Sequence, residues 1–258
     1  MESALQAFLT TGVFAFILTF VRLGTASIIM PGVGDSFVST RVRLHIAAAL
    51  SVAFFPLAMA YVPDPLPATF GLFTLITMEF IIGLFIGTMA RILMTALDTA
   101  GQVISISSGL GNAQLFNPSL ASQGSLVGAL LSVTGVLLLF ETNLHHLLFM
   151  GIMESYELFP LGAIPDTGSM ADLMARTVAA SFAVGIKISA PFVVMTLLIY
   201  VGMGVLSRLM PQIQVFILAL PLQILLSIVL LMMVISASMF YWLSQFEQGM
   251  VYFLSVAQ

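Results

Sequence analysis

The sequence predicts an all-α, polytopic integral membrane protein. Of its 258 residues, 60% are hydrophobic and 7% are charged, a composition typical of membrane chains. Several of its apolar runs are long enough to cross a bilayer of about 30 Å as a helix that rises about 1.5 Å per residue. Backbone polar groups in hydrocarbon need internal partners, and long runs without polar/apolar alternation favour helices over the strands of an outer-membrane barrel.

Six apolar runs define the expected helices, in the order Leu5 to Met30, Leu44 to Val62, Leu66 to Ala90, Leu126 to Phe140, Val178 to Leu206 and Ile213 to Trp242. The first run has no Lys or Arg before Arg22, so it lacks the basic start of a cleavable signal peptide and is expected to stay in the mature protein. We expect residues 1–258 to form one membrane-embedded subunit with about six helical segments arranged as hairpins. Six spans is an upper number, because hydropathy reports burial in lipid and in protein alike.

The distribution of arginines predicts the orientation of these helices. Four of them follow the first, third and fifth runs: Arg41, Arg43, Arg91 and Arg208. Basic residues accumulate in cytoplasmic loops, so these three junctions are expected to face the cytoplasm. The opposite junctions, Val62 to Pro67 and Gly151 to Asp172, are acidic. The pattern predicts an even number of spans with both ends outside.

The sequence offers no constellation typical of an enzyme. Because it has no cysteine, disulfides and thiolate metal sites are excluded, and its net charge of −4 gives no indication of nucleic-acid binding. HExxH, GxSxG and phosphate-binding glycine motifs are absent from it. Glu141 and His145 share a helical face beside His146, but two ligands on one turn do not make a metal site. We therefore expect neither catalysis nor a cofactor or metal.

The longest polar stretch, residues 105–125, is predicted to be a loop between two helices. Gly109, Gly111 and Asn112 tolerate positive φ, and the Asn117–Pro118 step disfavours helix. The stretch is unusual because Leu115 and Phe116 are bulky and apolar among glycines and amides. Two interpretations stay open: an ordinary connecting loop, or a segment that packs into a cavity.

Three ionisable residues lie inside apolar runs: Arg22, Glu79 and Lys187. Each costs at least about 2.5 kcal/mol at a bilayer centre unless it is paired or hydrated. Glu79 shares a helical face with Gly83 and Gly87, a spacing that lets another helix approach closely. The three charges are expected either to find partners at helix interfaces or to act in transport, and a pair between Glu79 and Lys187 is one possibility.

A proline-containing motif follows the fifth run: Arg208-Leu-Met-Pro-Gln-Ile-Gln-Val-Phe-Ile-Leu-Ala-Leu-Pro221. Pro211 and Pro221 are predicted to break the helical hydrogen-bond ladder, with glutamines supplying partners for the freed carbonyls. The motif is typical of a kinked hairpin turn, or of a bent helix that packs around a shared axis.

These motifs carry a resemblance to a known family. Arg208-x-x-Pro-Gln-x-x-Val-Phe with Pro221, Gly101-Gln-x-Ile with Gly109-Leu and Asn117-Pro118, and Arg22 with Arg41-Val-Arg resemble the FliR family of flagellar biosynthesis proteins. The family includes type III injectisome counterparts. The resemblance spans essentially the whole chain and is carried by the combination of motifs.

The resemblance implies a subunit of the type III export gate in the bacterial inner membrane, within the flagellar basal body. One copy would join the partners FliP and FliQ in a helical cone around a pore for unfolded flagellar proteins. Other membrane proteins of the export apparatus would supply the energy.

The resemblance also implies roles for individual residues. It makes the following residues a plug of the closed pore: Gly109, Leu110, Gly111, Asn112, Ala113, Gln114, Leu115, Phe116, Asn117 and Pro118. The late motif it matches, Arg208, Pro211, Gln212, Phe216 and Pro221, is expected to set assembly contacts, as is the early motif of Arg22, Arg41 and Arg43. The charges and glycines discussed above, Glu79, Gly83, Gly87 and Lys187, complete the expected interface residues.

Three alternatives remain at this stage. An injectisome subunit that secretes effectors would share the same motifs. A secondary transporter with a site at Glu79 and Lys187 should show a broken helix in both halves, but the proline-broken segment occurs only late in the chain. A scaffold without pore contact would tolerate deletion of Gly109 to Pro118 without a change in membrane permeability.

Overall fold

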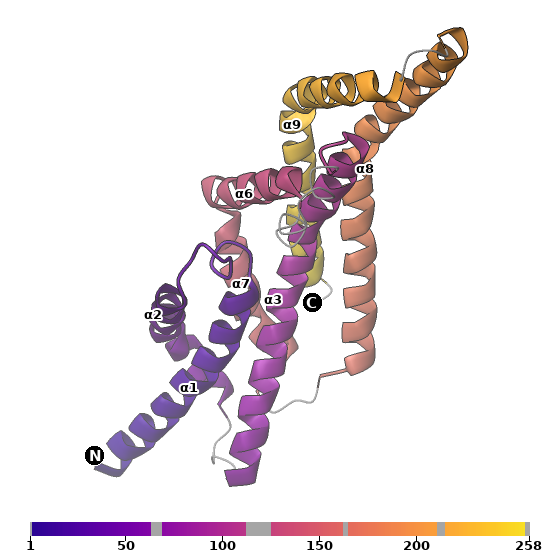
Figure 1. Cartoon of the computed structure of the whole chain (residues 1–258). Coiled ribbons are helices and arrows are strands. Elements are labelled where there is room, and N and C mark those ends of the chain that lie inside the picture. Colours follow the sequence, from indigo (N-terminus) through magenta and orange to yellow (C-terminus); the bar gives the residue numbers. More distant parts are fainter. Residues whose placement is uncertain (1, 63–68, 112–124, 162–164, 211–214, 256–258) are drawn as a thin grey trace. The chain divides into compact units, whose positions relative to one another are not determined.

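A computed structural model of the chain describes residues 2–62, 69–111, 125–161, 165–210 and 215–255, and their regular elements are all helical (Figure 1). This confirms the predicted all-α fold. In chain order, the elements are α1 (Glu2–Ile29), α2 (Thr40–Ala58), the 3₁₀ turn η1 (Met59–Tyr61), α3 (Thr69–Ser107), α6 (Leu126–Glu141), α7 (Leu144–Leu158), α8 (Thr167–Leu209) and α9 (Val215–Ser255).

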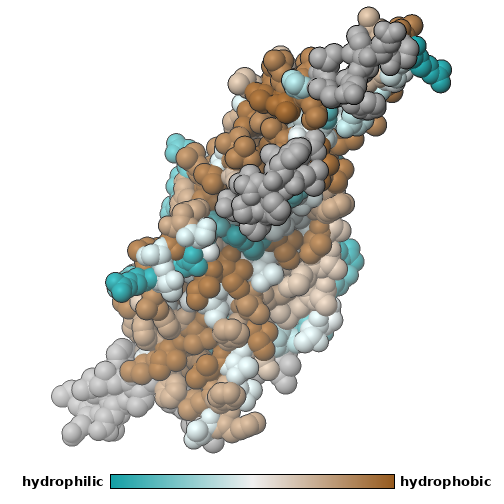
Figure 2. All heavy atoms as spheres, viewed as in Figure 1, coloured by the Kyte–Doolittle hydropathy of each residue, from teal (hydrophilic) through white to brown (hydrophobic). Residues whose placement is uncertain are grey.

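The described helices also confirm the polytopic membrane class. Five of them are long and apolar enough to cross a membrane, or six if α6 and α7, which are joined by a sharp bend, form one span. Hydrophobic residues predominate on the face drawn in Figure 2, where hydrophilic ones are few and scattered. The chain is therefore built to bury its surface in an apolar environment.

Three helices are longer than the apolar runs that predicted them. Helix α3 continues past Ala90 to Ser107, α8 begins at Thr167 rather than Val178, and α9 continues past Trp242 to Ser255. Charged residues delimited the runs that predicted α3 and α8, but a helix can carry a charge that has a partner. The predicted loop 105–125 is wrong at its start, because its first three residues form the last turn of α3.

The late proline motif is only partly described. Helix α8 ends at Leu209, Pro211 and Gln212 lie outside the described residues, and Phe216 lies in the first turn of α9. Pro221 lies inside α9, which continues through it, so at this residue the motif forms a helix and not a hairpin turn. A proline removes one backbone hydrogen bond, and the bonds on either side keep the helix continuous here.

The chain divides into two compact units, and four helices contribute residues to both. The first comprises residues 1–93, 139–177 and 247–258, and the second comprises residues 94–138 and 178–246. In the first unit, α1 packs against α2, η1 and α7, and its core contains the fully buried side chains Leu23, Ile82 and Ile152.

In the second unit, small residues allow close helix contacts. A Cβ atom at Gly101 of α3 would overlap the backbone of α6 at Gly128, and one at Gly185 of α8 would lie 2.9 Å from the carbonyl oxygen of Ala96. The side chains of Met94, Leu97 and Trp242 close over Gly135 of α6. Close approach through small residues is the usual way for helices to associate when both are apolar.

Candidate functional site at the buried Arg22–Glu79 pair

The most enclosed polar group of the first unit is an ion pair between α1 and α3. Nε of Arg22 donates to Oε2 of Glu79 at 2.6 Å, and Nη2 donates to Oε1 at 2.8 Å. The Arg22 side chain is 0% exposed and that of Glu79 is 1% exposed. This side-on, bidentate geometry is the strongest that a guanidinium and a carboxylate form.

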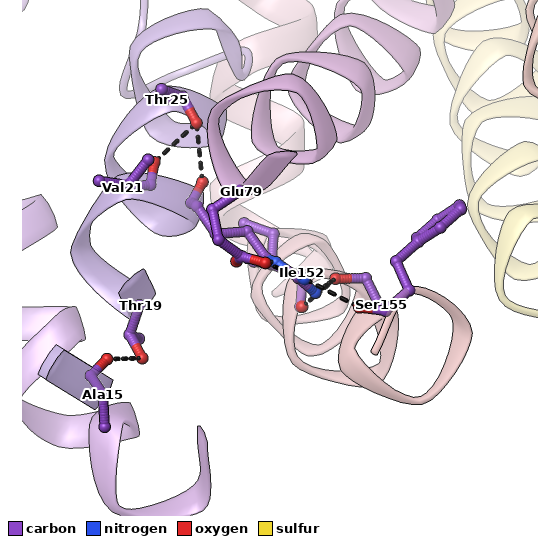
Figure 3. Close-up of polar contacts among 9 residues, drawn as sticks. Ala15, Thr19, Val21, Thr25, Glu79, Ile152 and Ser155 are labelled. Atoms are coloured by element: carbon purple, nitrogen blue, oxygen red, sulfur yellow. Dashed lines mark hydrogen bonds and ion pairs between the residues drawn. The ribbon is translucent and has the colours of Figure 1, made fainter. Parts of the chain in front are cut away.

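Helix α7 completes the surroundings of Arg22. Nη1 of Arg22 donates to the Ser155 hydroxyl at 3.0 Å, and Nη2 also donates to the carbonyl oxygen of Phe159 at 2.9 Å. The guanidinium carbon lies 3.7 Å from the centre of the Tyr156 ring, a cation–π contact. Figure 3 shows Glu79 and Ser155 directed toward the same region from α3 and α7. Every nitrogen of the guanidinium therefore has a partner.

The charges of this site balance within the chain. Both carboxylate oxygens of Glu79 accept hydrogen bonds from Arg22, which is therefore the partner that sequence reasoning left undetermined. Lys187 lies on α8 in the second unit, and its side chain is exposed. The possible pair between Glu79 and Lys187 is replaced by the Arg22–Glu79 pair. The site joins three helices, and its arrangement gives it a structural role.

The two glycines that follow Glu79 on α3 let α1 come into contact. A Cβ atom at Gly83 would overlap the side chain of Thr25 and the carbonyl oxygen of Arg22, and one at Gly87 would lie 2.7 Å from the carbonyl oxygen of Ala26. The Thr25 hydroxyl bonds back to the Val21 carbonyl at 2.7 Å, as Figure 3 shows. The helix that approaches this glycine face belongs to the same chain.

A second polar group lies at the turn after α1. The Asp35 carboxylate accepts a hydrogen bond from the backbone N–H of Gly32 at 2.7 Å and forms an ion pair with Arg91. Arg43 donates to the Asp35 carbonyl at 2.6 Å and to the Val38 carbonyl at 3.1 Å. The junctions after the first and third apolar runs, which the arginines predict to lie on the same side of the membrane, thus meet at Asp35. The nearby Arg41 is exposed.

Sequence reasoning did not single out Asp35, although a signal was present. It is the one acidic residue between Arg22 and Asp64, and it lies beside Gly32 and Gly34 in a junction otherwise marked by arginines. Gly32 has a φ of 88°, which favours glycine, and the Phe140 ring packs against it.

Hydrogen bonds hold both ends of the 105–125 segment within the second unit. The first end is the last turn of α3, and the second end bonds back to α3. The Ser107 carbonyl accepts a hydrogen bond from Thr196 of α8 at 2.7 Å and another from the Gln223 side chain of α9. At the other end, the Ser125 hydroxyl donates to the Gly101 carbonyl at 2.8 Å and accepts from the Gly128 N–H at 3.0 Å, which caps α6.

Only the first residues of the predicted plug are described. Gly109 has a φ of 79°, as expected for a glycine that ends a helix, and the Gly111 N–H donates to the Ser105 carbonyl at 2.9 Å. Leu110 is half-buried. The remaining predicted plug residues, Asn112 to Pro118, lie outside the described residues.

The group of Glu141, His145 and His146, which the sequence analysis considered as metal ligands, lies at the end of α6 and the start of α7. The His145 ring centre lies 5.0 Å from that of Phe140 and 4.2 Å from that of His146, while Glu141 is exposed at the end of α6. Across the described residues, no three potential metal ligands come together.

Comparison with known proteins identifies the family. Residues 13–249 match the model of the bacterial export proteins, family 1. The chain belongs to this family. It is 35% identical to the flagellar biosynthetic protein FliR of Caulobacter vibrioides over 92% of this chain and 94% of the relative. It is 29% identical to FliR of Bacillus subtilis over 86% of each chain, and 30% identical to the Yop proteins translocation protein T of Yersinia pestis over 70% of each.

Membership of the export family confirms the resemblance inferred from the motifs. It also identifies the chain as a membrane-embedded member of a family of export proteins rather than of an enzyme family. The buried Arg22–Glu79 pair accordingly contributes to the architecture of an export component.

Proposed function

We propose that the chain is a subunit of the flagellar type III export gate, and that it forms with FliP and FliQ the pore through which unfolded flagellar axial proteins cross the inner membrane. The observation that carries this proposal is the end-to-end similarity to FliR, with 92% of this chain and 94% of the Caulobacter vibrioides relative aligned. One copy of the chain joins the gate. Other proteins of the export apparatus supply the energy, and the chain is a passive part of the conduit.

The contacts inside the first unit support a passive role. The Arg22–Glu79 charges neutralise each other and are enclosed by α7, so this site holds helices together. The same geometry argues against a secondary transporter, because a substrate would have to displace Arg22 from both oxygens of Glu79.

Within the gate, residues Gly109 to Pro118 form the plug of the closed pore. The fixed ends of the segment support this role, since Ser107 and Gly101 lie six residues apart on α3, about 9 Å along the helix axis. Both ends of the segment therefore lie close to the C-terminal end of α3. The late motif, including Arg208, Pro211, Gln212, Phe216 and Pro221, provides contacts with the neighbouring gate subunits.

Secretion of flagellin tests the proposed function. We expect a strain without this gene to release no flagellin into the culture supernatant, and the restored gene to recover it. Purification of the tagged chain in mild detergent should also recover FliP and FliQ. Undiminished extracellular flagellin in the deletion strain would contradict the flagellar assignment.

Deletion of Gly109 to Pro118 tests the plug. We expect the altered gate to leak ions, which a membrane-potential dye would report, while the amount of chain in the membrane stays unchanged. A gate that stays tight after this deletion would favour a scaffold role without pore contact.

An injectisome subunit is the second candidate, favoured by the similarity to the Yersinia pestis protein. That similarity covers 70% of each chain, less than the alignment with the Caulobacter vibrioides FliR, so the flagellar assignment is preferred. Flagellin secretion that persists in the deletion strain, together with loss of effector secretion, would reverse this preference.

A further inference from the structure

The last turn of α3, like every helix end, has backbone carbonyls that need partners from outside the helix. Residues 108–111 satisfy three of them through N–H···O bonds of 2.8–3.2 Å, to the carbonyls of Ile104, Ser105 and Ile106. The remaining N–H of this stretch, that of Leu110, bonds to the Ser108 hydroxyl at 3.4 Å. Within the described turn, the Ser107 carbonyl is therefore left for partners on other helices.

Two buried side chains bind the Ser107 carbonyl. Thr196 of α8 donates its hydroxyl at 2.7 Å, and Gln223 of α9 donates from Nε2. Thr196 is 7% exposed and Gln223 is 3% exposed, and all three residues belong to the second unit. One donor is enough to satisfy a carbonyl, and burying a second polar side chain costs free energy. The second donor therefore ties another helix to the same point, and we call Ser107, Thr196 and Gln223 the Ser107 clasp.

The Ser107 clasp lies directly before the point at which the chain turns away from α3. The φ of 79° at Gly109 ends the helix there. The direction in which the chain leaves α3 depends on the orientation of this last turn. At residue 125 the attachment differs, because the Ser125 hydroxyl binds the Gly101 carbonyl within the body of α3. The first end of the segment is thus held by α8 and α9, and the second end by α3 itself.

We propose that Thr196 and Gln223 are positioning residues of the pore closure, which hold the last turn of α3 in the orientation that keeps the pore closed. A displacement of α8 and α9 that breaks both hydrogen bonds releases this turn. The role rests on the proposed plug function, and it names the contacts that regulate the plug. Hydrogen bonds suit a reversible hold, because each contributes only modestly to stability.

The use of two helices makes release depend on both of them. If α8 alone moves, Gln223 still binds the Ser107 carbonyl, and if α9 alone moves, Thr196 still binds it. Only a joint movement leaves this carbonyl without a donor. The Ser107 clasp therefore predicts that single substitutions keep the pore tight and that the double substitution opens it.

Ion leakage through the complete gate in cells, reported by a membrane-potential dye, tests the clasp. We expect Thr196→Val/Gln223→Leu to raise the leak by at least about fivefold, the smallest shift that losing a buried partner gives a two-state equilibrium. Each single variant should stay near the wild-type leak. Thr196→Ser/Gln223→Leu keeps a hydroxyl donor and should also stay tight, a difference that a role in shape alone would not produce.

Matched controls lie on the same two helices. The hydroxyls of Ser189 and Ser227 are buried and donate to carbonyls of their own helices, Ile186 of α8 and Gln223 of α9. Ser189→Ala/Ser227→Ala should therefore leave the leak unchanged. The amount of each variant in the membrane, and of FliP recovered with it, is measured in parallel, so that poor assembly is distinguished from an open pore.

A cysteine at Leu110 gives a second readout that does not depend on leakage. The chain has no cysteine, and Leu110 is half-buried directly after the clasp. We expect a water-soluble maleimide to label Leu110→Cys in the purified gate faster when Thr196→Val/Gln223→Leu is present. The control pair Ser189→Ala/Ser227→Ala should not change the labelling rate.

The deletion of Gly109 to Pro118 separates failure of the clasp from failure of the plug. A leaking deletion beside a tight Thr196→Val/Gln223→Leu gate would overturn the clasp and leave the plug standing. A deletion that does not leak would contradict the plug, and the role of the clasp with it. Equal leakage from the Thr196→Ser and Thr196→Val double variants would also overturn the clasp, because the hydroxyl donor would then be irrelevant.

Discussion

Arg22 of α1 and Glu79 of α3 lie 57 residues apart in the sequence and form a bidentate ion pair from which water is excluded. The pair lies where α1, α3 and α7 meet, and Arg22 also bonds to Ser155 and to the Phe159 carbonyl. Removal of water raises the cost of leaving either charge alone, so the stability of the first unit depends on both residues together.

We expect Arg22→Met to destabilise the chain by about 3–5 kcal/mol, because it leaves the Glu79 carboxylate buried without a partner. Thermal denaturation of the detergent-solubilised chain would measure the loss. The double variant Arg22→Met/Glu79→Met is the control and should recover much of it, since no charge is then buried. If the single and double variants were equally destabilised, the pair would owe its importance to shape rather than charge.

We expect Gly83→Ala to destabilise the contact between α1 and α3 by about 1–3 kcal/mol, because the added methyl overlaps Thr25 and the Arg22 carbonyl. Gly202→Ala is the matched control, since that position has open space and alanine favours a helix by about 1 kcal/mol. The same denaturation measurement compares the two. Equal effects would contradict the close packing of α1 on Gly83.

We expect the double variant Thr196→Val/Gln223→Leu to destabilise the chain by more than the sum of the single variants. Either donor alone keeps the Ser107 carbonyl satisfied, so each single change should cost no more than about 1 kcal/mol, whereas the double change leaves a partly buried carbonyl without a partner. A double-mutant cycle measures the difference. Additive effects would show that the two donors act independently.

We expect Asp35→Ala to loosen the turn between α1 and α2 and to speed tryptic cleavage at Arg43. The carboxylate holds the Gly32 N–H and Arg91, and Arg43 bonds to two carbonyls of the same turn. The free energy of unfolding should fall by less than about 1 kcal/mol, because the Arg91 side chain is 40% exposed and an ion pair screened by water contributes little. Asp172→Ala is the control for the loss of an exposed ion pair. An unchanged cleavage rate in the Asp35 variant would contradict this role.

Asp166 supplies a prediction about pH. The Ser169 hydroxyl, followed by the backbone N–H groups of Gly168 and Ser169, lowers the pKa of the Asp166 carboxyl. A lowered pKa in the folded state means that these hydrogen bonds stabilise the start of α8 at pH values above the ordinary aspartate pKa. The contribution is lost as the pH falls below about 4 through the lowered value. We expect Ser169→Ala to raise the Asp166 pKa toward its ordinary value, as a carbon-13 NMR titration of labelled aspartates would measure. No change would exclude Ser169 as the main cause.

The glycine face of α3 illustrates how far sequence reasoning reached. The spacing of Glu79, Gly83 and Gly87 indicated that another helix approaches closely, because four residues return a helix to the same face. It could not indicate which helix, because any apolar helix with a small-residue surface satisfies the same pattern. The identity of α1 as the neighbour follows from contacts between residues far apart in the chain.

The lengths of α3 and α8 show a different limit. Hydropathy ends a predicted segment at a charge, but Arg91 and Arg176 lie within helices because Asp35 and Asp172 are their partners. The second of these pairs was detectable from its spacing of four residues. The first joins residues 56 apart, and only the folded chain brings them together.

The sequence by itself determined the all-α membrane class and the export family, because both depend on composition, apolar run length and the order of local motifs. Only the tertiary structure decided that Arg22 meets Glu79, that Asp35 joins Arg43 and Arg91, and that Thr196 and Gln223 share the Ser107 carbonyl. The physical reason is that a buried charge or carbonyl requires a partner without specifying which one. Packing makes that choice, by bringing one donor and one acceptor within about 3 Å of each other.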